Sequence, residues 1–133
     1  MSEENEQVIR RAFDALNRGD LDAAKRLADP ECEIRTLTSS LADRTYRGHA
    51  GVEQWFADAG ESWEAISQTP ERFIAVDAER TVVHLRFKAR GKGSGVEISQ
   101  MATAMWRVRD GTVREVRNYA TIDEALQATR LSE

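Results

Sequence analysis

The stretch VREVRNYATIDEAL, residues 113–126, decides more about the fold than any other part of the chain. It follows an Asp110-Gly111 pair, which is a strong signal for a tight turn between antiparallel strands. The first half of the stretch predicts a strand and the second half predicts a helix. Thr121 and Glu124 have the spacing of a capping box, so this helix is expected to begin directly after the threonine.

A second stretch, RRAFDALNRGDLDAAKRLADP at residues 10–30, predicts two short helices in succession. Apolar residues recur at helical spacing over residues 4–18 and again over residues 21–28. Gly19 supplies a left-handed stop for the first helix. Asp20 can cap the second helix, because its carboxylate accepts hydrogen bonds from amides that have no partner inside the helix.

The middle of the chain changes from helical to alternating periodicity. Residues 33–38 predict a short strand, residues 39–48 a polar loop, and residues 49–66 a third helix with an apolar stripe. The period then becomes two, which predicts four further strands at 71–77, 81–90, 96–109 and 112–119. Their short connections require antiparallel neighbours. The order therefore predicts an α+β fold, with helices gathered on one side of a bent sheet.

The composition is that of a single globular domain spanning residues 1–133. Hydrophobic residues make up 41% of the chain and charged residues 32%, without a run of about 18 apolar residues that would span a membrane. The acidic N-terminus is unlike a secretory signal, and the single cysteine, Cys32, fits a reducing compartment. A net charge of −4 argues against nucleic acid as a partner. We therefore expect a cytoplasmic protein without membrane or nucleic-acid partners.

Several motifs spread over nearly the whole chain carry a family resemblance: Phe13 to Asp22, Tyr46-Arg47-Gly48, Trp55, Ser94-Gly95, Arg109-Asp110-Gly111 and Asp123 to Leu126. They resemble the nuclear transport factor 2-like superfamily, in its SnoaL-like and ketosteroid-isomerase-like branch. The resemblance implies a cystatin-like roll, in which a cone-shaped, bent antiparallel or mixed sheet packs on three helices from the N-terminal half. It also implies a short C-terminal helix, a deep apolar pocket and, commonly, a dimer through the outer face of the sheet.

The superfamily includes isomerases, polyketide cyclases, epoxide hydrolases, dehydratases and non-catalytic modules, so the fold alone does not select a function. Ketosteroid isomerase chemistry needs a carboxylate base and an oxyanion hole made by a tyrosine and a protonated aspartic acid. Aligned with that family, this chain has Thr36 in place of the base, Ala12 in place of the tyrosine and Ala104 in place of the acid. Steroid-isomerase chemistry is rejected on these grounds, and whether the protein is an enzyme stays open.

Alternation on the strand at 81–90 indicates which of its side chains face the pocket. Leu85 and Phe87 share the apolar face, which is expected to form the pocket wall, whereas His84 and Arg86 lie on the other face. A slip of one residue in register would reverse this assignment and would place a possible general base inside. The strand has no acid of the kind that epoxide hydrolases of the superfamily use.

The strand at 96–109 has a single polar residue, Gln100, on its otherwise apolar face, beside the small Ala102. A buried amide needs a hydrogen-bond partner, so Gln100 either orients a ligand or bonds to backbone or water. The family resemblance places a second amide, Asn118, in the pocket as well. Amides orient carbonyl groups but transfer protons poorly, which favours binding over acid–base chemistry.

Aromatic and hydroxyl side chains complete the predicted site. Trp55 and Trp63 lie on one face of the third predicted helix, and Tyr46 lies on the loop expected to cover the mouth of the cone. The predicted ligand-binding residues are Thr36, Tyr46, Trp55, Trp63, Leu85, Phe87, Gln100, Ala102 and Asn118. Neither a metal site nor a cofactor is expected, since the two histidines and one cysteine show no ligand spacing.

Three functions stay open. The leading hypothesis is a protein that binds a small, mainly apolar molecule in the cone pocket. The second is a SnoaL-like cyclase, isomerase or hydrolase acting on a polyketide- or terpenoid-like substrate. The third is a non-catalytic dimerisation module, which a pocket well below roughly 300 Å³ would favour. A homodimer is expected through the outer face of the sheet, where the many basic side chains of the strands are predicted to pair with acids.

Overall fold

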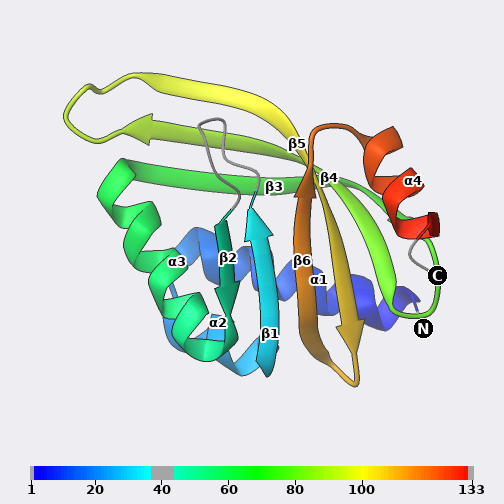
Figure 1. Ribbon diagram of the computed structural model, residues 1–133. Coiled ribbons are helices and arrows are strands. Elements are labelled where there is room, and N and C mark those ends of the chain that lie inside the picture. Colours follow the sequence, from blue (N-terminus) through cyan, green and yellow to red (C-terminus); the bar gives the residue numbers. More distant parts are fainter. Residues whose placement is uncertain (1, 37–43, 132–133) are drawn as a thin grey trace.

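The computed structural model describes residues 2–36 and 44–131, which form helices packed on a six-stranded sheet (Figure 1). In chain order the elements are α1 (Ser2–Arg18), α2 (Leu21–Leu27), β1 (Ala28–Thr36), β2 (Arg44–Arg47), α3 (Gly48–Ser62), β3 (Trp63–Ala75), β4 (Arg80–Gly91), β5 (Glu97–Arg109), β6 (Thr112–Tyr119) and α4 (Ile122–Leu131). This arrangement confirms the predicted α+β class, including the short C-terminal helix.

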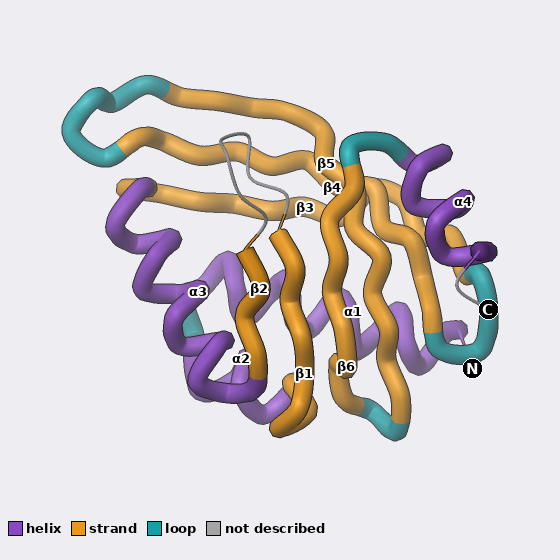
Figure 2. Tube along the Cα trace, viewed as in Figure 1, coloured by secondary structure: helices purple, strands orange, loops and turns teal. Residues whose placement is uncertain are grey.

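The strands lie in the order β2-β1-β6-β5-β4-β3, and the sheet is mixed. β1 runs parallel to β6, whereas β3, β4, β5 and β6 form an antiparallel meander. Figure 2 shows the long strands β3, β4 and β5 curving over the other elements, which gives the sheet its bend. Helices α1 to α3 lie against one face, called the inner face below, and α4 lies against the opposite, outer face (Figure 1).

The predicted helix ends at Gly19-Asp20 and Thr121 are confirmed. Gly19 has a φ of 67°, which a residue with a side chain rarely adopts, and it ends α1. The Asp20 carboxylate accepts a hydrogen bond from the Ala23 N–H at 3.0 Å and caps α2. The Thr121 hydroxyl accepts a hydrogen bond from the Glu124 N–H at 3.1 Å and caps α4.

The chain after α2 becomes extended earlier than predicted. β1 begins at Ala28, because Ala28 already pairs with Val113 of β6. The register between β1 and β6 shifts before Glu33, which accommodates Pro30 and its missing N–H. The short strand β2 was predicted as loop. Residues 37–43, where the predicted strand ends and the loop begins, lie outside the described residues.

The third helix is shorter than predicted, because strand pairing takes over its last turn. α3 ends at Ser62, and Trp63 is the first residue of β3, with an extended backbone (φ −123°, ψ 133°). Trp63 pairs with Gly91 of β4, and the Lys92 N–H donates to the Ser62 carbonyl at 3.2 Å. Pro70 lies inside β3, which is possible because β3 is an edge strand and its register shifts there.

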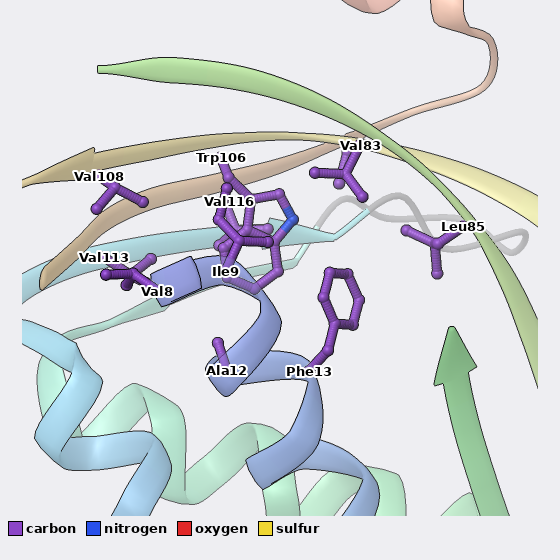
Figure 3. Packing of buried hydrophobic residues seen from close by; sticks show 11 residues of the cluster. Val8, Ile9, Ala12, Phe13, Val83, Leu85, Trp106, Val108, Val113 and Val116 are labelled. Atoms are coloured by element: carbon purple, nitrogen blue, oxygen red, sulfur yellow. The ribbon is translucent and has the colours of Figure 1, made fainter. Parts of the chain in front are cut away.

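The core lies between α1 and the inner face of the sheet (Figure 3). Ile9 and Phe13 of α1 pack against a cluster that includes Val83, Trp106 and Val116. The rings of Phe13 and Trp106 are 5.1 Å apart between centroids and tilted by 43°. Burial of this apolar surface is the main stabilising contribution to such a fold. None of the helices in the described ranges is long and apolar enough to cross a membrane.

The outer face of the sheet carries the predicted ion pairs. Arg107 lies 3.3 Å from Glu79 and 3.7 Å from Glu115, and Arg117 lies 3.2 Å from Glu115. Similar pairs join the basic side chains of β4 to acids on β3 and β5. These contacts are exposed or partly exposed, so solvent screens them and each contributes little to stability.

Candidate functional site

A small cavity lies between the inner face of the sheet and the helices α1 and α3. Its volume is about 90 Å³. Its wall is formed by Phe13, Leu16, Ile34, Thr36, Val52, Trp55, Phe56, Gln68, Leu85, Ala104, Trp106, Val116 and Asn118. None of these described lining residues has a titratable side chain. The site therefore offers apolar surface, an aromatic ring system and a few neutral polar groups.

Four of the predicted ligand-binding residues line this cavity. Thr36 comes from β1, Trp55 from α3, Leu85 from β4 and Asn118 from β6. The three strand residues share the inner face of the sheet, where Asn118 is directly opposite Ala104 of β5, and Trp55 reaches the cavity from α3. Whether any of the four binds a ligand stays a prediction.

A wider groove adjoins the cavity where the end of α1 meets α3 and the start of β3. Its volume is about 370 Å³, and it is lined by Leu16, Asn17, Arg18, Gly19, Trp55, Phe56, Ala59, Gly60, Trp63, Glu64, Ala65, Ile66 and Gln68. Four of these residues also line the cavity: Leu16, Trp55, Phe56 and Gln68. The cavity and the groove therefore lie next to each other, and Trp55 and Phe56 belong to the wall of both.

Trp63 lines the groove and Phe87 packs against Trp63, but neither residue is in the cavity wall. Their rings are 5.9 Å apart between centroids and nearly perpendicular, at 74°. Trp63 reaches the groove from the first position of β3 and not from α3, so the prediction that both tryptophans share one helix was wrong. Phe87 packs at the edge of the core cluster.

Gln100 and Ala102 are on the predicted face of β5 but do not line the cavity. Gln100 pairs with Phe87, on the part of β5 that runs from the projecting hairpin, and its side chain is exposed. The expectation of a buried amide at Gln100 was therefore wrong, and water can satisfy this side chain. Ala102 pairs with Leu85 and packs against the core cluster.

Tyr46 does not lie on a loop over the mouth of the cone, which corrects the prediction. It is a buried residue of β2, and its hydroxyl donates to the Asp58 carboxylate of α3 at 2.7 Å. The backbone of Tyr46 is so close to Gly51 that a Cβ at Gly51 would lie 2.7 Å from the Tyr46 carbonyl carbon. Tyr46 thus joins β2 to α3 and is absent from the cavity wall.

His84 and Arg86 lie on the outer face, as alternation predicted. The Nδ1 atom of His84 is 3.1 Å from the hydroxyl oxygen of Thr103, which pairs with His84 on β5. Arg86 lies 3.4 Å from Glu71 of β3. The arrangement that would give the cavity a histidine base is therefore contradicted.

The wall residues that sequence reasoning did not assign to the site come from α1, α3 and four of the strands, namely Phe13, Leu16, Ile34, Val52, Phe56, Gln68, Ala104, Trp106 and Val116. Phe13 and Leu16 were visible as the apolar face of the first helix, but the pattern did not show that this face borders a void. Gln68 is held in place by Asn17, which donates to the Gln68 carbonyl and accepts from the Gln68 N–H, both at 2.8 Å. These two hydrogen bonds fix the end of α1 to β3 at Gln68, which lines both the cavity and the groove.

The single cysteine lies outside this wall. Cys32 is buried on β1, and its Sγ atom is 3.8 Å from the Gly48 carbonyl oxygen. Burial is the largest influence on this thiol and raises its pKa above the usual value, although the contact with Gly48 acts in the opposite direction. A raised pKa leaves little reactive thiolate, which supports the prediction of a structural cysteine.

Comparison with known proteins places this geometry in context. The model of the SnoaL-like domain family matches residues 9–116. No curated protein matches the chain. A solved structure of a nuclear transport factor 2-like protein from Burkholderia xenovorans LB400 is 27% identical, covers 95% of each chain and has a TM-score of 0.74.

Two more distant structures share the fold. TerC, which was co-crystallised with polyporic acid, is 18% identical over 93% of this chain and 96% of its own, with a TM-score of 0.78. The epoxide hydrolase/cyclase-like enzyme SalBIII, described for pyran ring formation in the polyether salinomycin, is 13% identical over 92% and 94%, with a TM-score of 0.76. At such identities the likeness shows the fold alone.

Proposed function

This chain belongs to the SnoaL-like domain family, and from that premise we propose that it binds a small, mainly apolar molecule across the cavity and the groove beside it. The observation that carries the proposal is that the two spaces lie next to each other and share Leu16, Trp55, Phe56 and Gln68 in their walls. Movement of these shared side chains would let one molecule occupy both spaces.

The volumes suggest how a ligand would be divided between the two spaces. The cavity of about 90 Å³ is smaller than the roughly 150 Å³ void known to hold a benzene ring, so it suits one small ring or a short branched chain. The groove of about 370 Å³ would take a longer substituent. Arg18 and Glu64 in the groove wall would tolerate polar groups on that part of the molecule.

The two alternative functions have less support. Acid–base catalysis in the cavity would need a titratable group, and the described lining residues supply none. A cavity of about 90 Å³ is below the range of typical ligand sites, which by itself favours a purely structural module. The adjoining groove is the reason to prefer binding, because a tightly packed structural core gives no reason for a depression of about 370 Å³ at its edge.

A thermal-shift series of phenyl ketones would test this proposal. Acetophenone would place one end in the cavity, and hexanophenone adds a chain that extends farther along the groove, so both are expected to raise the melting temperature in a dose-dependent way. Trp55→Ala removes wall from both spaces and should weaken both compounds. Trp63→Ala removes wall from the groove and should weaken hexanophenone more than acetophenone. The proposal fails if neither ketone stabilises the folded protein.

We also propose that the protein is a homodimer through the outer face of its sheet and that it is cytoplasmic. The ion-paired strands β5 and β6 leave a broad polar surface there, of which α4 covers one end. A second copy could pair with this surface through exchange of the partly exposed ion pairs. Sedimentation equilibrium at low and high salt would test it, and a monomer at all concentrations and salts would exclude this dimer.

A further inference from the structure

Trp106 has a buried hydrogen-bond donor without a partner. Its side chain is 5% exposed, and its indole Nε1 atom makes no hydrogen bond to any described residue. Trp106 also lines the cavity. In Figure 3 the indole nitrogen points away from Val108 and toward the side where Phe13 and Leu85, two further wall residues, are found.

An unpaired indole N–H in this position is unusual. More than nine-tenths of buried polar groups in folded proteins have a partner, and an indole has only this one donor to satisfy. Three arginine Nε atoms in the described part of the chain also lack partners, but in Arg114 and Arg117 another nitrogen of the same guanidinium forms an ion pair. Trp106 has no such second contact, and it is the one that borders a void.

We propose that Trp106 is a specificity-determining residue of the binding site, whose N–H donates to a neutral oxygen atom of the bound molecule. This inference rests on the proposed binding function and narrows it to a ligand class: apolar molecules with a ketone, ester or ether oxygen on the part that enters the cavity. Hydrocarbons leave the N–H unsatisfied. A carboxylate is excluded, because the described wall has no cation to compensate a buried charge.

The chemistry of the wall restricts the other possible occupant, which is water. A buried water usually makes about three hydrogen bonds. Besides the indole N–H, the polar side chains of the described wall are Thr36, Gln68 and Asn118, and the remaining wall side chains, apart from Trp55, offer a water no hydrogen bond. A ligand oxygen needs only the single contact that the N–H provides, since the remaining surface of the ligand is apolar.

The test compares acetophenone with α-methylstyrene, which has the same shape but a methylene group in place of the oxygen. The ¹⁵N-tryptophan-labelled wild-type protein has three indole N–H signals, and the signal that is missing from Trp106→Phe belongs to Trp106. Each compound is then titrated into the wild-type protein. We expect acetophenone to move the Trp106 indole proton downfield, as a new hydrogen bond does. We expect α-methylstyrene to bind without this downfield shift.

The affinities give a second, independent readout. One hydrogen bond corresponds to about a three- to tenfold preference, so Trp106→Phe should reduce the preference for acetophenone over α-methylstyrene by about that factor. Trp55→Phe is the matched control, because Trp55 lines the cavity but its indole nitrogen is not among the buried donors without a partner. This variant should bind both compounds more weakly and leave the ratio of the two affinities unchanged.

The outcomes separate this inference from the proposed function. The assignment of Trp106 is overturned, while the binding function stands, by either of two results. In the first, both compounds bind and shift the Trp106 indole signal equally. In the second, Trp106→Phe does not change the ratio of the two affinities. A Trp106 indole proton already at a hydrogen-bonded position in the free protein shows a water partner and also overturns it. Binding of neither compound overturns both. If Trp106→Phe does not fold, the indole shift in the wild-type protein decides.

Discussion

Ala104→Val is the substitution that examines the cavity most closely. Ala104 is 3% exposed, lies in the cavity wall on β5, and is flanked in register by Val83 and Asn118. Valine is compatible with a strand and would place its additional carbon atoms in the void. We expect the variant to be more stable than the wild-type protein and to bind ligands less well, as often happens when a functional cavity is filled.

The magnitude follows from the cavity volume. At roughly 24 cal/mol per Å³, a void of about 90 Å³ corresponds to about 2 kcal/mol of stability that the wild-type protein lacks. Valine adds about two carbon atoms, each worth roughly 0.8 kcal/mol when buried without strain. Allowing for imperfect fit, Ala104→Val should gain about 1 kcal/mol, which corresponds to a rise of about 3–5 °C in melting temperature.

Urea unfolding of the variant at constant m-value, together with an acetophenone titration, measures both effects. Ala102→Val is the control, because Ala102 is on the same face of β5 but outside the cavity wall. This variant should bind acetophenone as tightly as the wild-type protein does. A loss of more than about 1 kcal/mol in Ala104→Val indicates overpacking and would refute the void. A gain in stability with unchanged binding would place the ligand elsewhere.

Three further predictions concern other parts of the chain. Cys32, with its buried thiol and raised pKa, should react with iodoacetamide at neutral pH only after unfolding; mass spectrometry that finds rapid labelling of the native protein would contradict this. Gly51→Ala should destabilise the protein by about 1–3 kcal/mol in urea, because its Cβ would meet the Tyr46 backbone at 2.7 Å; unchanged stability would show that α3 can move away. Burial raises the pKa of the Asp77 carboxyl, but hydrogen bonds led by the Arg80 side chain outweigh this and lower its pKa overall. The ionised Asp77 carboxylate therefore stabilises the fold above the usual carboxyl pKa of about 4, and this contribution is lost as the pH falls further. Asp77→Asn should make the free energy of unfolding depend less on pH in the acid range. Parallel curves for the variant and the wild-type protein would argue against this.

The parts of the fold that could be predicted are those that local chemistry determines. Gly19 and Asp20 fix the break between α1 and α2, and Thr121 fixes the start of α4. Alternation alone placed Leu85 inside and His84 outside, because β4 is paired on both sides and its two faces differ clearly. In each case the deciding interactions lie within a few residues or follow the pleat of a single strand.

The errors come from residues whose state depends on distant partners. Trp63 continues a helical pattern but becomes a strand residue through its pairing with Gly91. Tyr46, in a polar stretch, is buried because Asp58 of α3 accepts from its hydroxyl. Gln100 follows the inner-face alternation of β5 but is exposed, since a strand can be longer than the core that covers it.

The candidate site was predicted only in part, because some of its features also depend on distant partners. The pattern and the family resemblance together identified Thr36, Trp55, Leu85 and Asn118, which line the cavity. Trp106 lies in the core, but a pattern of apolar residues does not show which buried group borders a void or lacks a hydrogen-bond partner. Those properties depend on packing between elements that are far apart in the sequence.

The central claim, that the cavity and its groove hold an apolar ligand, is tested most directly by isotope-filtered nuclear Overhauser spectra of the wild-type protein with saturating acetophenone. The account predicts contacts from the ligand to the methyl groups of Leu85 and Val116 in the cavity wall. Contacts only to Val82 on the outer face or to the exposed Val96, or a complete absence of contacts, would contradict it.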